Sequence, residues 1–247
     1  MRVPMLSSRH PASLADLPIG GSPTAAPAAL VVEHLNAFYG PAQALSDISF
    51  TVEPGTVLGL VGQNGAGKTT LLRTIGGLHR RASGRVEYAG ASLLGRRPDQ
   101  VAVRGIGLVR DGGRVFENLT IREHLIIATQ LGRKRLQGSR DVDQLLEMFP
   151  VLAQRGAQTK AGYLSGGQRQ LLCLAMAVGS AAGCLLLDEP SAGLAESTAE
   201  EVFRIIRRFA DEGLTLLIAE QDVRWLSALT GRAAELEMGR IVGYVDT

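Results

Sequence analysis

Nine consecutive residues constrain the fold of this chain more than any other feature: Gly62 to Thr70, with the sequence GQNGAGKTT. They fit the pattern G-x-x-x-x-G-K-[ST], in which glycines allow a tight turn and consecutive backbone N–H groups point at an anion. The apolar residues 57–61 predict a buried strand just before this loop. The helix predicted after it adds free N–H groups and a positive dipole. The segment therefore predicts a site for nucleotide phosphates; a glycine-rich turn before an ordinary helix is the alternative.

Two side chains of this loop have predicted roles of their own. The Lys68 ammonium group is expected to contact the β- and γ-phosphates, and the Thr69 hydroxyl is a predicted ligand of Mg²⁺. Backbone N–H groups of the loop are expected to surround the phosphates. The predicted phosphate-binding residues are Gly62, Asn64, Gly65, Ala66, Gly67, Lys68, Thr69 and Thr70.

An acidic pair, Asp188-Glu189, follows the apolar residues 184–187. A strand that ends in Asp-Glu places both carboxylates at the carboxyl edge of a parallel sheet, where loops of this kind hold their phosphates. Asp188 is predicted to hold Mg²⁺, directly or through water, and Glu189 to polarise the attacking water as general base. Taken alone, the pair is equally well explained as acidic residues that cap a helix.

A second predicted helix start, Leu164 to Gln168, has the sequence LSGGQ. It offers free N–H groups, the Ser165 hydroxyl and two small residues, Gly166 and Gly167, that allow close approach of a phosphate. Ser165 and Gln168 also have the spacing of a capping box, so an N-cap function is expected in either case. The intact string between the glycine-rich loop and the Asp-Glu strand is a specific combination.

The remaining patterns predict an α/β fold with a parallel αβα core around residues 55–80 and 160–245 and helices near 111–160. Further strands are predicted at 30–32, 48–52, 83–88, 106–109, 214–219 and 241–245. Helices are predicted from Thr120, over 142–149 and over 202–209. Residues 1–29 are rich in proline and small residues and are predicted to form a disordered tail.

Other features exclude classes of protein. Residues 171–187 carry no charge, but Gly179 to Gly183 favours a turn there, so no transmembrane segment is predicted. Cys173 and Cys184 lie in apolar runs and are expected to be buried thiols in a reducing cytosol. The formal net charge of +2 argues neither for nor against nucleic acid, and no nucleic acid partner is expected. The cluster Arg133-Lys134-Arg135 is expected to be a solvated loop, with a patch for a partner as the alternative.

From about residue 30 to its end, the chain resembles the ATP-binding cassettes of ABC transporters. Within that family it is similar to the ATPase subunits of branched-chain amino acid importers. The supporting strings are NAFYG at 36–40, GQNGAGKTT at 62–70, GRVF at 113–116, LSGGQ at 164–168 and AEQ at 219–221. The resemblance implies the P-loop ABC ATPase fold: a parallel-sheet αβα core with an antiparallel β subdomain and a helical subdomain at about 111–160.

The resemblance also implies roles for three further residues. Tyr39 is expected to stack on adenine; a half-buried core aromatic is the alternative. Asp111 takes the place of a glutamine that senses Mg²⁺ and the γ-phosphate. Gln221 takes the place of a histidine, and its amide can contact a phosphate oxygen without taking up a proton near neutral pH. The predicted catalytic residues are therefore Glu189, Gln221 and Asp111, and the predicted metal ligands Thr69, Asp188 and Asp111.

The resemblance implies ATP and Mg²⁺ as cofactors and a second ATPase subunit, expected to be a paralogue, in a head-to-tail dimer. Each ATP would lie between one chain's P-loop and the residues 165–168 of the other, and the loop from Ser191 to Ala195 would cross to the partner. Transmembrane permease subunits would be partners at the cytoplasmic face of the cell membrane, with a solute-binding protein acting indirectly. The ATPase of a urea or amide importer, a non-transport ABC ATPase and a weakly hydrolysing regulatory subunit are alternatives.

Overall fold

The computed structural model describes residues 28–133, 140–180 and 182–247. The predicted tail at 1–29, the basic cluster at 133–135 and the predicted turn at 179–183 lie wholly or partly outside these ranges. Within them, no helix is both long and apolar enough to cross a bilayer.

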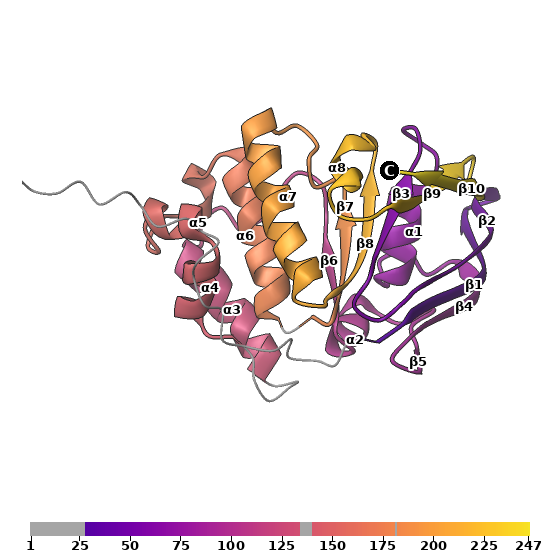
Figure 1. Ribbon diagram of the computed structural model, residues 1–247. Helices are drawn as coiled ribbons and strands as arrows, with labels where there is room; N and C mark the ends of the chain where they lie inside the picture. The colour runs from indigo at the N-terminus through magenta and orange to yellow at the C-terminus, as the bar shows by residue number, and fades with distance from the viewer. Residues whose placement is uncertain (1–27, 134–139, 181) are drawn as a thin grey trace, which may run out of the picture.

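A six-stranded sheet forms the centre of the molecule, in the strand order β10-β9-β3-β8-β7-β6 (Figure 1). Within this sheet β9, β3, β8, β7 and β6 are mutually parallel, and β10 pairs antiparallel with β9 at one edge. The predicted α/β class and the predicted edge strand near 241–245 are confirmed. The strands are β3 (Val57–Val61), β6 (Ile106–Val109), β7 (Cys184–Asp188), β8 (Thr215–Glu220), β9 (Arg232–Glu237) and β10 (Arg240–Asp246).

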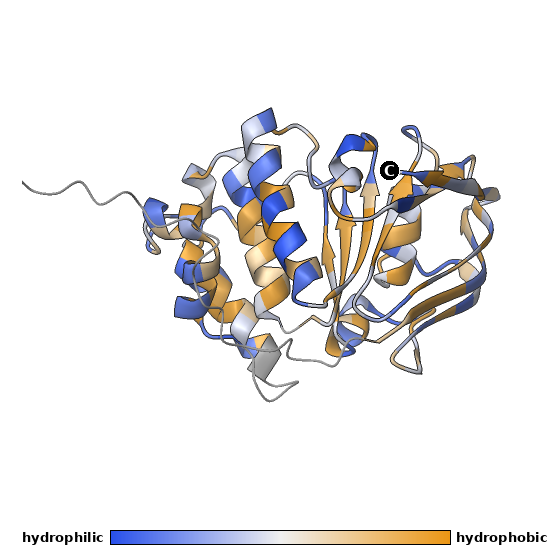
Figure 2. Ribbon diagram, viewed as in Figure 1, coloured by the Kyte–Doolittle hydropathy of each residue, from blue (hydrophilic) through white to orange (hydrophobic). Residues whose placement is uncertain are grey.

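Helices cover both faces of this sheet, which explains why its inner strands are apolar on both sides. On β8, Leu216 and Ile218 pack into the core with α6 (Gly166–Gly179) and α7 (Glu196–Asp211). The alternate residues Leu217 and Ala219 pack into the other core with α1 (Lys68–Ile75). Figure 2 shows hydrophobic colour along these strands and hydrophilic residues on the outer side of α7. Each fully buried leucine contributes about 1.5–3 kcal/mol, so both cores stabilise the strand ends that carry the site.

A second, antiparallel sheet in the order β2-β1-β4-β5 lies beyond α1 (Figure 1). Its strands are β1 (Leu30–Tyr39), β2 (Ala42–Val52), β4 (Ala82–Tyr88) and β5 (Ala91–Ser92). The strands predicted at 30–32 and 48–52 were too short. The pairing of β1 with β2 shifts register between Val32 and Leu35, and His34 there has a positive φ of 49°. Such an irregularity interrupts the two-residue alternation from which strands are predicted. The short helix α2 (Pro98–Val103) follows β5 and was not predicted.

Three helices lie between β6 and α6 in the chain: α3 (Ile121–Arg133), α4 (Val142–Met148) and α5 (Pro150–Arg155). The predicted capping box opens α3, because Glu123 Oε2 accepts a hydrogen bond of 2.7 Å from Thr120 N and Thr120 Oγ1 accepts one of 3.2 Å from Glu123 N. A partly buried ion pair of 2.8 Å joins Arg140, just before α4, to Glu212 at the end of α7. The helical region is thereby attached to the sheet domain.

The turn between β9 and β10 supports the glycine-rich loop. Gly239 in this turn donates a hydrogen bond of 2.9 Å to the Ala66 carbonyl, and its own carbonyl accepts one of 2.8 Å from the backbone N–H of Ser46 within β2. Gly239 has a φ of 77°, and a Cβ there would lie 2.3 Å from the Ala44 carbonyl oxygen, so only glycine fits. The loop is therefore held by the last two strands of the chain as well as by β3 and α1.

Candidate active site

The loop from Gly62 to Gly67 connects β3 to α1, as the sequence predicts. Gly62 has no room for a side chain, because a Cβ would lie 2.3 Å from the Leu236 carbonyl oxygen. Gly67 has a φ of 111° directly before Lys68, the first residue of α1. The loop and Glu189 enclose a cavity of about 200 Å³. Its lining residues are Gln63, Asn64, Gly65, Gly67, Lys68, Thr69, Thr70 and Glu189. Gly62 and Ala66 line an adjacent cavity of about 430 Å³ beside the β9–β10 turn.

Lys68 is held in place within this cavity. Its side chain is only 3% exposed, and its Nζ donates a hydrogen bond of 2.6 Å to the Gly62 carbonyl. The same Nζ lies 3.2 Å from Oε1 of Glu189. A buried ammonium group needs such partners, because burying an unpaired charge is costly. The predicted phosphate-binding cation and the predicted base therefore face each other across the cavity.

Glu189 follows the last residue of β7 in an uncommon backbone conformation. Its φ is 46°, in the left-handed region that side chains other than glycine rarely adopt. Its backbone N–H donates a hydrogen bond of 2.9 Å to the Ala219 carbonyl on β8. The turn directs the carboxylate toward Lys68 and leaves the side chain 23% exposed, within reach of water.

The carboxylate of Asp188, 1% exposed, lies beside the hydroxyl of Thr69. Thr69 Oγ1 donates a hydrogen bond of 2.9 Å to Asp188 Oδ1. Burial raises the pKa of Asp188, the Thr69 hydrogen bond opposes this rise, and the nearby charges of Asp111 and Glu189 add to it. The nearby charge of Arg73 lowers the Asp188 pKa, and a metal cation beside this buried carboxylate would do the same.

Two carboxylate oxygens in this place have no hydrogen-bond partner among the described residues: Oδ2 of Asp188 and Oδ1 of Asp111. Carboxylate and hydroxyl oxygens are hard donors, and Mg²⁺ is commonly bound through one or two carboxylates together with phosphate oxygens. No cluster of three or more acidic, histidine or cysteine residues suited to a metal ion occurs in the described ranges. The oxygen donors of Thr69, Asp188 and Asp111 would suit a Mg²⁺ ion that takes its remaining ligands from phosphate and water.

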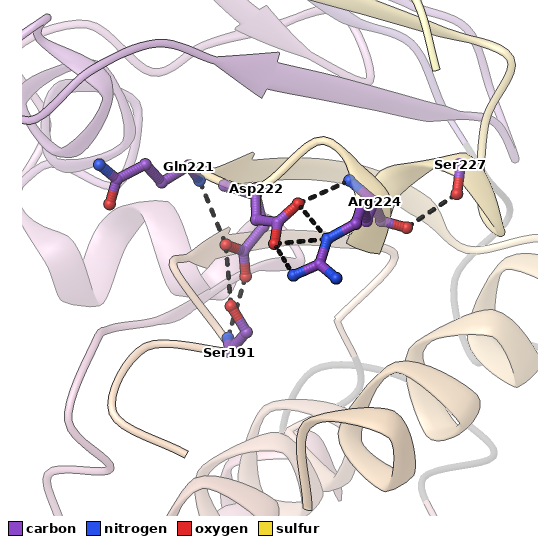
Figure 3. Close-up of polar contacts among 6 residues, drawn as sticks. Ser191, Gln221, Asp222, Arg224 and Ser227 are labelled. Atoms are coloured by element: carbon purple, nitrogen blue, oxygen red, sulfur yellow. Dashed lines mark hydrogen bonds and ion pairs between the residues drawn. The ribbon is translucent and has the colours of Figure 1, made fainter. Parts of the chain in front are cut away.

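Gln221 follows β8, next to the end of β7. Its side chain is exposed and points away from the neighbouring carboxylates in Figure 3. The preceding residue, Glu220, is 2% exposed and accepts hydrogen bonds from Ser191 N (2.9 Å), Ser191 Oγ (3.0 Å) and Gln221 N (3.2 Å). No role for Glu220 was predicted. A glutamate at the end of an apolar strand was the signal, because a carboxylate in that position must find donors.

The residues 165–168 lie outside the cavity at Lys68 and form a second predicted phosphate-binding segment. Ser165 caps α6: its Oγ accepts from Gln168 N at 3.3 Å and Gln168 Oε1 accepts from Ser165 N at 3.0 Å, which confirms the capping box. Ser165 and Gly166 are exposed, and none of the four residues lines the cavity at Lys68. Gly167 is buried, since a Cβ there would lie 2.1 Å from Thr198 Cγ2.

A buried hydrogen bond connects the helix α6, which begins at residues 166–168, to the segment that follows Asp111. On α6, Gln170 is 3% exposed and its Oε1 accepts a bond of 3.1 Å from the backbone N–H of Gly113. Gly113 lies two residues after Asp111. The helix that begins at the LSGGQ segment is therefore attached to the segment that carries a predicted metal ligand.

Tyr39 ends β1 and is 49% exposed, with its ring centroid 4.5 Å from that of His79. It does not line the cavity at Lys68. Its predicted stacking on adenine stays a prediction.

The chain is similar in sequence to known proteins of one family. A model of the ABC transporter family matches residues 45–192. BraG, a high-affinity branched-chain amino acid transport ATP-binding protein of Pseudomonas aeruginosa, is 39% identical over 86% of this chain and 91% of its own. A probable branched-chain amino acid transport ATP-binding protein of Archaeoglobus fulgidus, LivF, is 37% identical over 84% of this chain and 87% of its own. The lipopolysaccharide export system ATP-binding protein LptB of Haemophilus influenzae is 32% identical over 86% and 88%.

The fold is similar to solved structures of the same kind. A dimeric ATP-binding cassette in a post-hydrolysis state, bound to ADP and Pi, superposes with a TM-score of 0.75 at 22% identity. The match covers 88% of this chain and 98% of that one. At this identity the similarity concerns the fold alone.

Proposed function

This chain belongs to the ABC transporter family of ATPases, and we propose that it is the ATP-hydrolysing subunit of an importer for branched-chain or related amino acids. One observation carries the catalytic part of this proposal: Lys68, Thr69, Asp188 and Glu189 meet at the carboxyl edge of one parallel sheet. The similarity to BraG supports the class of substrate.

The glycine-rich loop binds the triphosphate of ATP. Its N–H groups and the start of α1 surround the phosphate oxygens, and Lys68 contacts the β- and γ-phosphates. Because Lys68 is already fixed by the Gly62 carbonyl, little side-chain entropy is lost when ATP binds. Tyr39 would stack on the adenine ring of the bound ATP.

Hydrolysis requires a base and a polar group near the γ-phosphate. Glu189 orients and deprotonates the attacking water, and the Gln221 amide contacts a γ-phosphate oxygen. Thr69, Asp188 and Asp111 would hold Mg²⁺, which when bound would neutralise charge on the phosphate oxygens.

The segment from Ser165 to Gln168, whose first two residues are exposed, completes the site of a second subunit. The N–H groups of Gly166 and Gly167 at the start of α6 suit the γ-phosphate of an ATP bound to a partner chain, so the working unit is a head-to-tail dimer. Closure of this dimer on ATP and its opening after hydrolysis would move the helices α3–α5, and with them the permease subunits at the cytoplasmic face of the membrane.

Uptake of labelled solutes tests the transport function. Cells that lack this chain should lose leucine uptake and keep urea uptake, and the wild-type chain should restore leucine uptake. The Glu189→Gln chain, produced at the same level, should not restore it. Normal leucine uptake together with loss of urea uptake would replace the amino acid proposal with a urea or amide importer.

A further inference from the structure

A buried carboxylate that the proposed chemistry does not use lies beside the candidate base. Glu220 ends β8 with 2% of its surface exposed, and its burial raises its pKa. Its two oxygens accept three hydrogen bonds, two from Ser191 and one from the backbone N–H of Gln221 (Figure 3). A buried charge is tolerated only when such donors offset its desolvation. The three bonds therefore fix these segments firmly to the end of β8.

The segments that Glu220 joins carry both proposed catalytic groups. Ser191 lies two residues after Glu189, and Gln221 is the residue that follows Glu220 itself. One residue before Glu220, the Ala219 carbonyl accepts the N–H of Glu189 at 2.9 Å. The end of β8 thus contacts the chain on both sides of the left-handed turn at Glu189.

We propose that Glu220 is a positioning residue for ATP hydrolysis, which holds Glu189 and Gln221 in a fixed relation through Ser191 and the Gln221 backbone. This inference rests on the proposed role of Glu189 as the base. A carboxylate that shifts by about 1 Å from its place can lower a rate about a hundredfold. The loop that binds the phosphates is built from residues 62–70, and Glu220 does not line its cavity. Loss of the contacts should therefore lower kcat and leave the KM for ATP unchanged.

The Glu220 position needs two acceptor oxygens, which glutamate has and glutamine does not. Two backbone N–H groups, of Ser191 and Gln221, point at different oxygens of Glu220. A glutamine has one oxygen and one NH₂ group, so in either orientation one backbone N–H faces another donor. The Ser191 hydroxyl, by contrast, makes only one of the three bonds.

The test compares Glu220→Gln, Ser191→Ala and the double variant by steady-state ATPase kinetics of the full chain. Glu220→Gln should lower kcat about tenfold or more with KM within about twofold of wild type, and Ser191→Ala should lower kcat about threefold. The double variant should match Glu220→Gln, since the hydroxyl acts through this carboxylate. Asp222→Asn is the matched control: this exposed carboxylate pairs with Arg224 instead, so its kcat should stay within about twofold of wild type.

Several outcomes would overturn the proposal. Positioning by Glu220 is contradicted if Glu220→Gln has a wild-type kcat, or if its KM for ATP rises by the same factor by which kcat falls. It is also contradicted if the effects of the two substitutions are independent in the double variant. Where thermal melting shows that Glu220→Gln does not fold, a wild-type kcat in Ser191→Ala is decisive against it. The proposed function fails separately, when wild type does not hydrolyse ATP or Glu189→Gln keeps the full rate.

Discussion

Nζ of Lys68 lies 3.2 Å from Oε1 of Glu189. In this arrangement the cation that would bind the phosphates is paired with the carboxylate that would activate water. A triphosphate carries more negative charge than one carboxylate, so ATP should compete for Lys68 and release Glu189 for its role as base. Binding of the substrate and activation of the base are thereby coupled through one side chain.

Glu189→Gln should keep ATP binding and lose turnover. The amide can still accept a hydrogen bond from Lys68, but it cannot take a proton from water, so the rate should fall about a hundredfold to ten-thousandfold. ATP should then hold the chain in a closed dimer, detected by size-exclusion chromatography with and without ATP. Unchanged turnover would exclude Glu189 as the base.

Lys68→Ala should weaken ATP binding itself. Truncating one partner of a buried, hydrogen-bonded charge pair costs about 2–5 kcal/mol, which corresponds to a loss of affinity of about thirtyfold or more. Isothermal titration with ATP measures this loss. Arg204→Ala, which removes an exposed residue of α7, is the control and should bind like wild type. Equal affinities of the two variants would contradict the assignment of Lys68.

Asp188→Asn should stabilise the metal-free chain at neutral pH. Burial raises the pKa of Asp188 above its ordinary value of 3.8, so the folded state binds this proton more tightly than the unfolded state. Stability therefore falls as pH rises from 3.8 through the raised folded pKa, and the cost is fully present above it. Removing the charge removes that cost and should raise Tm by about 2–4 °C for each kcal/mol.

Thermal melting with and without Mg²⁺ and ATP measures this effect. The gain should disappear below pH 3.8, where the carboxyl group is protonated in both states. Mg²⁺ and ATP together should stabilise the wild type much more than Asp188→Asn, because the variant lacks a metal ligand. A lower Tm of the variant at neutral pH without metal would contradict the prediction. In Asp222→Asn, whose carboxylate has a pKa lowered by Arg224, the sign should reverse.

Gln221→His should introduce a new ionisation into the pH–rate profile. The Gln221 amide does not titrate, whereas a histidine in an exposed position changes charge near its ordinary pKa of about 6.5. The ATPase rate of the variant should therefore gain a step near that pH that Gln221→Ala lacks. A step of this kind in wild type that Gln221→Ala removes would show that the position already controls a titrating group.

The features that could be predicted from the sequence are those that depend on residues close together in the chain. The loop at 62–70, the Asp188-Glu189 pair and the Ser165 cap each depend on a short string, and the α/β class follows from strands buried on both faces. Glu220 was missed because its partner Ser191 is 29 residues away. The strand β9 was missed because its buried residues include two alanines, Ala233 and Ala234, which give a weak apolar signal. The catalytic, metal and adenine roles stay predictions.

The position of β3 in the sheet has a consequence for synthesis of the protein. This strand carries the phosphate loop, yet its two neighbours, β8 and β9, come from the last third of the chain, and Gly239 then fastens the loop itself. A ribosome makes the loop early and its support late. We therefore expect a nascent or prematurely terminated chain that ends before Arg232 to contain the whole nucleotide motif without retaining ATP. Affinity for ATP would then report that translation has passed the final hairpin.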